Sequence, residues 1–270
     1  MKIFKIKNLS LLVVTLAALN QSCTREIPQV APLATDLASK ANVQVFSSTL
    51  KAARNYVYVD GVTVSGATFS YNGVFPGTAY SFIVEPGSRS VLIKDTLAAT
   101  TQTQLTFSQA FDAGKSYTVF TYDTVTSVKQ LTVQNSITVP ADTTSMLRFG
   151  NFIYNNAAVP NVDVYSFKRI PGTPVLVNTP VLNSTAIFVP VFTGSTPVFN
   201  NIATNQASPF VPYASGVTDT LYVFATGTTS PLLAKGFITS LVPTRSYTSV
   251  YNGSYRGALS TRTVTTFVTY

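Results

Sequence analysis

The stretch Tyr56-Val57-Tyr58-Val59-Asp60-Gly61 establishes the fold class. Its side chains alternate as in a half-buried β-strand, and Asp-Gly then marks a tight reversal of the chain. A related stretch, Asp163-Val164-Tyr165-Ser166-Phe167, occurs once more along the chain. Two copies of one strand pattern predict two β-domains.

Further pairs of segments keep the same order in both halves. The segment 146–151 corresponds to 42–47, and 214–223 corresponds to the turn and strand near Gly87 and Val91. Ser246-Tyr247-Thr248 matches Ser116-Tyr117-Thr118, each after a basic residue. The offset grows from roughly 105 to roughly 130 residues, which predicts longer loops in the second copy, with the longest insertion at 171–212 and an added hairpin around 186–189.

Composition supports the same fold class. Hydrophobic residues make up 46% of the 270-residue chain and charged residues 10%, and Ser and Thr together make up roughly a quarter. Thr, Val, Tyr and Phe favour strands, and long amphipathic helical patterns are absent. We therefore predict an all-β protein with two tandem antiparallel β-sandwiches, immunoglobulin-like or transthyretin-like, at 41–138 and 146–270. The segment 135–145, which carries Pro140 and three threonines between apolar segments, is the expected linker between them.

The first 22 residues have the layout of a lipoprotein signal peptide. Three lysines precede the apolar run Leu11 to Leu19, which is too short to span a bilayer, and Cys23 follows. Cys23 is the single cysteine, and we expect lipidation there to anchor the protein to a membrane. Asn20 stands where such signals usually have Leu, so an ordinary cleaved signal with a stray cysteine is the alternative.

Residues 23–40 contain two prolines and no sustained period, which predicts a lipid-anchored tether. The expected location is therefore the cell envelope, on the outer membrane. Without the three leader lysines, 15 basic residues face 10 acidic ones, so the net charge falls from +8 to +5. The basic residues are scattered, and we expect no nucleic-acid partner.

The repeated motifs resemble an uncharacterised envelope repeat, the family called domain of unknown function 4397. The resemblance covers both halves and is closest at Gly114-Lys115-Ser116-Tyr117-Thr118. The first copy has Tyr56 where the family has Asp, and the second has Phe167-Lys168 in place of Asp-Gly. The resemblance implies an immunoglobulin-like or transthyretin-like sandwich in a bacterial lipoprotein and supplies no catalytic residues.

The chain lacks the residues that several classes of enzymatic reaction require. The chain has no histidine, which excludes Ser-His and Cys-His nucleophilic sites and the usual zinc sites. Acids lie singly along the chain, and a glycosidase pair such as Asp60 with Glu85 would rest on two ordinary turn residues. We therefore predict a protein without catalytic activity, metal or cofactor.

Aromatic residues offer the better binding hypothesis. Tyr71, Phe75 and Tyr80 cluster around Asn-Gly and Pro-Gly turns, where their rings could stack on sugars or pack into the sandwich. The leading hypothesis is an anchored envelope protein for adhesion, scaffolding or ligand presentation, with other envelope proteins or glycans as partners. The alternative is a surface glycan-binding module of a polysaccharide-capture system.

Overall fold

The computed structural model describes residues 36–169 and 196–269, and these residues form an all-β structure with two short 3₁₀ helices. The helices, η1 (Leu37–Ser39) and η2 (Leu259–Thr261), lie outside the sheets. Four sheets carry the rest of the fold, which confirms the prediction of tandem β-sandwiches. Within the described residues, no helix has the length and apolar character needed to cross a membrane.

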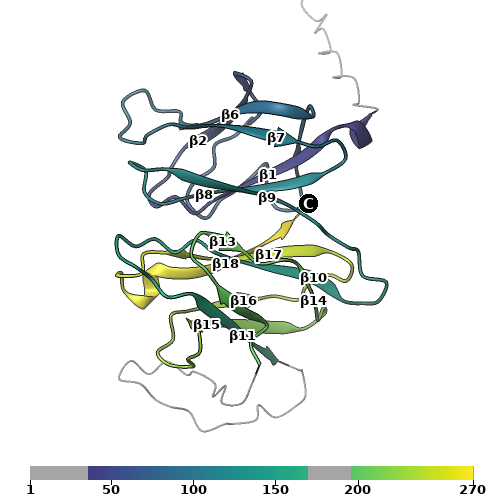
Figure 1. Cartoon of the computed structure of the whole chain (residues 1–270), viewed down its shortest axis with the longest axis vertical. Helices are drawn as coiled ribbons and strands as arrows, with labels where there is room; N and C mark the ends of the chain where they lie inside the picture. The colour runs from purple at the N-terminus through teal and green to yellow at the C-terminus, as the bar shows by residue number, and fades with distance from the viewer. Residues whose placement is uncertain (1–35, 170–195, 270) are drawn as a thin grey trace, which may run out of the picture. The chain divides into compact units, whose positions relative to one another are not determined.

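The first sandwich contains two sheets (Figure 1). Its strands are β1 (Ala41–Ser47), β2 (Asn55–Val59), β3 (Val62–Thr63), β4 (Val74–Phe75), β5 (Phe82–Val84), β6 (Gly87–Asp95), β7 (Leu105–Phe111), β8 (Ser116–Tyr122) and β9 (Lys129–Gln134). One sheet has the order β3-β2-β6-β7. The other has the order β4-β1-β8-β9, and β5 also pairs with β1.

The second sandwich repeats this topology strand for strand. Its strands are β10 (Ser145–Asn151), β11 (Val162–Arg169), β12 (Phe199–Ile202), β13 (Gln206–Ala207), β14 (Val211–Tyr213), β15 (Thr218–Ala225), β16 (Ala234–Ile238), β17 (Ser246–Gly253) and β18 (Arg262–Thr269). The sheet orders are β12-β11-β15-β16 and β13-β10-β17-β18, with β14 on β10. Each strand therefore has a counterpart in the first half.

The equivalence changes the meaning of the predicted insertion at 171–212. β12, β13 and β14 lie in its second half and take the places of β3, β4 and β5, so they belong to the repeat. The apolar segment 186–189, for which we predicted an added hairpin, lies outside the described residues.

The stretch 56–61 forms most of β2 and the turn that follows it. Val57 is fully buried and pairs across the sheet with Ile93, while Tyr56 and Tyr58 project from the opposite face. Asp60 and Gly61 have φ values of 50° and 80°, the left-handed conformation that a tight two-residue hairpin requires. In β11, Val164 takes the place of Val57 and is equally buried.

The prediction of purely antiparallel sandwiches was wrong in one detail. β1 pairs with β8 in parallel, and β10 pairs with β17 in parallel. Hairpin connections force antiparallel pairing only on strands that follow each other closely. The partners in these pairs are separated by several other strands, so the chain has room to return in the same direction.

A tyrosine fixes the same corner in each sandwich. The Tyr117 hydroxyl accepts a hydrogen bond from the Asp112 backbone N–H at 3.0 Å, and Tyr247 accepts one from the Val242 N–H at 2.9 Å. Both bonds reach five residues back along the chain, as in the tyrosine corner of immunoglobulin-like sandwiches. This shared role explains why Ser-Tyr-Thr occurs in both copies.

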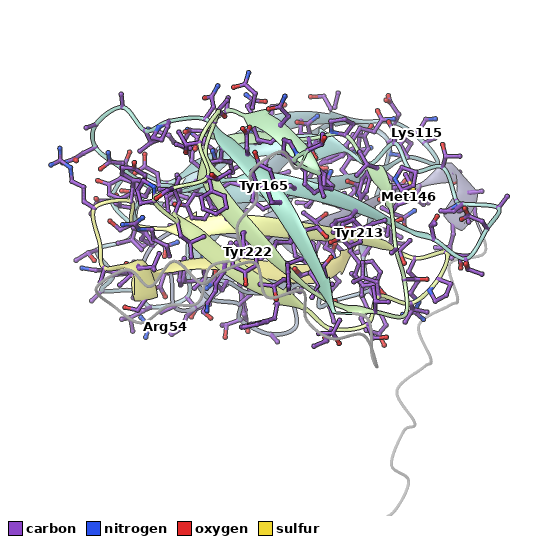
Figure 2. The ribbon with its side chains drawn as sticks, turned by 90° about the horizontal axis from the view of Figure 1, so that it is seen from below. Arg54, Lys115, Met146, Tyr165, Tyr213 and Tyr222 are labelled. Carbon is purple, nitrogen blue, oxygen red and sulfur yellow. The ribbon has the colours of Figure 1, made fainter. Side chains whose placement is uncertain are left out.

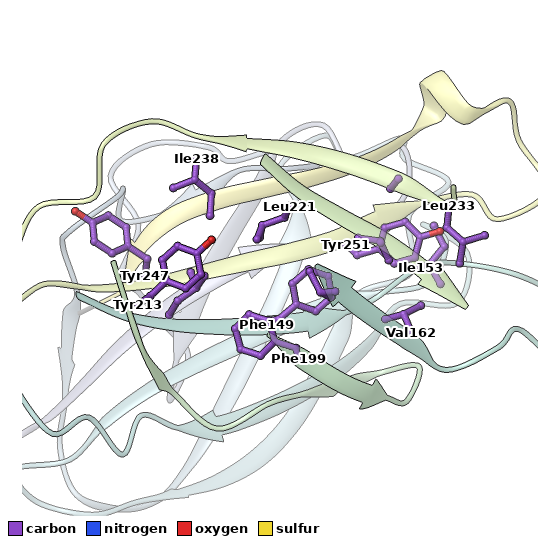
Figure 3. Close-up of a cluster of buried hydrophobic side chains, with 14 of the residues drawn as sticks. Phe149, Ile153, Val162, Phe199, Tyr213, Leu221, Leu233, Ile238, Tyr247 and Tyr251 are labelled. Carbon is purple, nitrogen blue, oxygen red and sulfur yellow. The ribbon is translucent and has the colours of Figure 1, made fainter. Parts of the chain in front are cut away.

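Each sandwich encloses its own apolar core. In the second, Phe149, Leu221 and Tyr251 are fully buried between the two sheets (Figure 3). The first is built around Val45, Val57 and other buried side chains from both of its sheets. Burial of this apolar area is the main stabilising contribution to each sandwich.

A third apolar cluster joins the sheet containing β1 and β8 to the sheet containing β10 and β17. Phe46 stacks on Phe267 with ring centroids 5.0 Å apart, and Phe120 stacks on Phe152 at 4.6 Å. The described residues from 37 onward accordingly form one compact unit.

Two segments predicted to connect folded parts make specific contacts. At the end of the expected tether, Lys40 forms an ion pair with Glu85 at 2.6 Å. Asn135, at the start of the expected linker 135–145, is buried and hydrogen-bonded to Thr118. The folded part therefore begins a few residues before 41 and includes the start of the linker.

Candidate functional site

The three aromatic residues predicted to bind a ligand have different surroundings. Phe75 is 7% exposed and packs against Phe69 and Phe82 in the first core. The half-buried Tyr71 donates a hydrogen bond to Asn252 of the second sandwich at 3.3 Å. Tyr80 is 68% exposed. The structure therefore places one in a core, one at the contact between the sandwiches and one in solvent.

The other residues considered in the sequence analysis, Asp60, Glu85 and Cys23, also do not share one site among the described residues. Asp60 accepts hydrogen bonds from the Ser90 backbone N–H and from Arg89, and these bonds lower the pKa of its carboxyl group, the backbone bond contributing most. Glu85 pairs with Lys40 instead. Cys23, the predicted lipidation site, lies outside the described residues. No group of three or more potential metal ligands occurs among residues 36–169 and 196–269.

A groove opens where loops of the two sandwiches meet. It has a volume of about 460 Å³. Its lining comes from the β8–β9 hairpin, the segment after β10 and the turn between β12 and β13, and includes Tyr122, Asp123, Lys129, Phe152, Tyr154, Asn155, Asn161 and Asn205. A volume of this size is typical of small-ligand sites.

Aromatic rings form one part of the groove lining. Phe152 is buried and lies 5.7 Å from the half-buried ring of Tyr122, measured between centroids. Burial raises the pKa of the Tyr122 hydroxyl, so it remains a neutral hydrogen-bond donor at physiological pH. Tyr154 lies two residues beyond Phe152 and is also half-buried. The groove therefore combines apolar ring surface with hydroxyl groups.

Side-chain amides form another part. Asn161 donates a hydrogen bond to Asn201 at 2.8 Å, and Asn155 donates one to the Ala157 carbonyl at 3.0 Å. Asn205 has a φ of 59° in the tight β12–β13 turn, a conformation that Asn tolerates better than most residues. Its backbone N–H is held by the Asn151 carbonyl at 2.6 Å. These contacts hold the amide-bearing segments in place.

The charges of the groove cancel. Lys129 and Asp123 form an ion pair at 2.7 Å, and the hydrogen bond to Asp123 raises the pKa of the Lys129 ammonium. Asp123 is the single carboxylate among the residues that line the groove. A site with paired charges, rings and amides suits a neutral, hydroxyl-rich ligand better than an ion.

Sequence reasoning missed this groove, although a signal was present. Phe152-Ile153-Tyr154-Asn155-Asn156 directly follows the predicted strand 146–151 and combines rings with amides, as binding loops often do. Tyr122 and Asp123 lie about 30 residues earlier along the chain, shortly after the repeated Ser116-Tyr117-Thr118 segment. Nothing in the local patterns indicates that these two segments meet.

No family model and no curated protein matches the chain. A similar solved structure is the family 26 carbohydrate-binding module CBMbc from Eubacterium rectale Amy13K, in complex with maltoheptaose. The alignment has 11% identity and a TM-score of 0.22, and it covers 85% of this chain and 95% of that chain. At this TM-score the likeness carries no argument about function. The resemblance to domain of unknown function 4397 stays a prediction.

Proposed function

We propose that the chain is a non-catalytic binding protein of the cell envelope whose groove holds a neutral glycan. The observation that carries the proposal is the lining of the groove: Tyr122 and Tyr154 offer rings, Asn155 and Asn161 offer amides, and the one ion pair is internally neutral. Sugar rings have apolar C–H faces and hydroxyl edges, which match these two kinds of groups.

The groove supports binding better than hydrolysis. Glycosidases use two carboxyl groups that flank the scissile bond, whereas the groove is lined by one, which is bound to Lys129. The chain also has no histidine to act as a base. A glycan in this groove would be held and released unchanged.

A glycan array with a parallel hydrolysis assay tests the proposal on the full chain. We expect binding to one class of neutral glycan without turnover, and we expect Tyr154→Ala to weaken it by roughly tenfold, the value of one lost stacking contact. Tyr80→Ala, which removes the exposed tyrosine, is the matched control and should bind normally. The absence of binding to any glycan on the array, or hydrolysis of a bound glycan, would overturn the proposal.

We also propose that lipidation of Cys23 holds this binding protein on the outer membrane. The leader lysines, the short apolar run and the single cysteine support this part of the proposal. Cys23→Ala should move the protein from the membrane fraction to the soluble fraction. A Cys23→Ala variant that remains in washed membranes would contradict it.

A further inference from the structure

A second hollow lies on the outer face of the β2–β6 sheet, opposite to the face that covers the core. It has a volume of about 520 Å³ and is lined by Tyr56, Tyr58, Lys94, Asp95, Thr96, Leu97, Ala98, Thr100, Gln102 and Gln104. We call it the outer-sheet hollow. All its lining residues belong to the first sandwich.

Two tyrosines of β2 form a platform in this hollow. Tyr56 and Tyr58 are two positions apart on the strand, so they project from the same face with about 7 Å between their Cα atoms. Both side chains are half-buried and line the hollow. Two rings in a row are suited to stacking on successive rings of a polymer.

Lys94 supplies a positive charge beside this platform. It pairs across the sheet with Tyr56, and its ammonium lies 4.9 Å from the centroid of the Tyr58 ring. Within the described residues, Lys94 makes no ion pair. Its contact with the ring leaves its positive charge without a counter-ion, so the charge can attract an anion.

The other charges of the hollow neutralise each other. Asp95 accepts two hydrogen bonds from Arg54, both at 3.2 Å, and one from Thr100 at 2.9 Å. Burial raises the pKa of Asp95, but the bonds from Arg54, the Leu97 N–H and Thr100 outweigh it, so the pKa is lowered and the carboxylate stays ionised. The hollow therefore carries one excess positive charge, on Lys94.

Neutral polar groups complete the lining. Gln102 donates a hydrogen bond to Asn55 at 2.6 Å, which holds its side chain against the sheet. Gln104 is the next lining residue on the same side, and Thr96 is exposed at the rim. A phosphate is usually held by several cations or an Arg fork, whereas here a single ammonium accompanies amides, hydroxyls and rings.

The equivalent face of the second sandwich is closed. Tyr165 stands in the place of Tyr58, and Phe224 stands in the place of Lys94. Tyr165 and Tyr222, labelled in Figure 2, are both 7% exposed. Phe224 is fully buried. Among the described residues, the repeat thus keeps the strand in both copies, and the pair of half-buried tyrosines beside a lysine occurs in the first copy.

From this lining we infer that the outer-sheet hollow binds a glycan that carries carboxylate groups. Tyr56 and Tyr58 stack on the sugar rings, Lys94 pairs with a carboxylate, and Gln102 and Gln104 bind hydroxyl groups. The hollow is separate from the groove, and its ligand differs in charge.

The test compares oligomers of galacturonic acid with oligomers of galactose of equal length, titrated into the full chain by calorimetry. We expect the acidic oligomers to bind, more weakly as salt is raised, and the neutral ones to bind at least about tenfold less tightly. Lys94→Gln and Tyr58→Ala should each weaken the acidic ligand by roughly tenfold or more.

Matched variants distinguish binding in the outer-sheet hollow from binding elsewhere on the chain. Lys235 lies over the ring of Phe237 at 5.9 Å in the second sandwich, so Lys235→Gln removes a similar cation–ring pair and should leave binding unchanged. Tyr154→Ala, which impairs the groove, should also leave it unchanged. Acidic oligomers that fail to bind, that bind no better than neutral ones, or that bind Lys94→Gln normally overturn the inference. Thermal melts test whether Lys94→Gln and Tyr58→Ala remain folded. If Tyr58→Ala is unfolded, the result for Lys94→Gln alone decides the inference.

Discussion

Arg148 joins the two sandwiches through several buried polar contacts. It is 1% exposed and donates hydrogen bonds to Thr118 and Asn135 on one side and to Thr248 on the other, at 2.9 to 3.2 Å. Its guanidinium also lies 4.6 Å from the centroid of the Phe210 ring. Burial lowers its pKa to about 9, which leaves the group charged at neutral pH.

Truncation of Arg148 should destabilise the full chain. Arg148→Ala leaves a cavity and removes the hydrogen bonds that Thr118, Asn135 and Thr248 accept from the guanidinium, so we expect the free energy of unfolding to fall by about 2–4 kcal/mol in urea titrations. Arg89→Ala, which breaks a solvent-exposed pair with Asp60, is the control and should cost under about 1 kcal/mol. Equal losses in both variants would show that the buried contacts contribute little.

The two tyrosine corners should have similar energetic value because each hydroxyl accepts a hydrogen bond from a backbone N–H five residues upstream. Tyr117→Phe and Tyr247→Phe each leave a backbone N–H without its acceptor, and we expect each to cost about 1–2 kcal/mol. Tyr80→Phe, at an exposed position, should have no measurable effect. A corner variant as stable as the unmodified chain would mean that water replaces the hydroxyl.

Among the strands, close packing between β16 and β18 restricts one position to glycine. A Cβ atom at Gly236 would lie 2.5 Å from the Val264 Cβ and 2.8 Å from the Val264 carbonyl oxygen. These strands belong to the two facing sheets of the second sandwich, so either the backbone or the core would have to shift.

Gly236→Ala should therefore lower stability by about 1–3 kcal/mol, the usual cost of overpacking. Gly66→Ala is the matched control, because a Cβ there meets no atom within 4 Å, and we expect a change below about 0.5 kcal/mol. Chemical denaturation of both variants measures the difference. The packing argument fails if the two variants unfold at the same denaturant concentration.

Local sequence patterns predict the longer strands of the first sandwich but miss two of the shortest, β4 and β13. β2 and β6 alternate between buried and more exposed side chains, and β8 is a run of strand-favouring residues buried at five consecutive positions. Local patterns predict a strand at each of these stretches. β4 and β13 have two residues each, too few for any period to show, and both are strands because β1 or β10 offers them backbone partners. Pairing at a sheet edge depends on the neighbouring strand as much as on the local sequence.

For the molecule as a whole, contact between the sandwiches should affect how a fragment behaves. The core of the first sandwich is complete within residues 41–119, so we expect residues 37–138 to melt cooperatively. Without the second sandwich, however, Phe46 and Phe120 lose their partners, and the fragment should melt at a lower temperature and self-associate. Light scattering and calorimetry test both points, and a monomeric fragment with an unchanged melting temperature would contradict them.

Alkaline pH should unfold the protein through its buried tyrosines. Burial is the main cause that raises the pKa of both Tyr213 and Tyr251 above the ordinary value of about 10. Because these groups ionise more readily in the unfolded chain, their contribution to stability is complete below about pH 10 and is lost as the pH rises further.

Urea midpoints should therefore fall between about pH 10 and 11.5, and Tyr251→Phe should make the fall shallower. Arg148 also loses its proton more readily in the folded chain than in the unfolded one, because its pKa is lowered, and this makes folding more favourable above about pH 9. Several buried tyrosines outweigh one arginine. A midpoint that does not change up to pH 11.5 would contradict the expectation.

Local patterns in the sequence were enough to establish the fold class and the strands with strong alternation, because a strand pattern depends on about six consecutive residues. The repeat followed from comparing the order of such patterns in the two halves. Three other features became visible only in the folded chain: Phe75 lies in a core, Arg148 is buried between sheets, and Tyr122 and Tyr154 line one groove. Such contacts join segments tens of residues apart. Their approach is set by the packing of whole sheets, which no local pattern records.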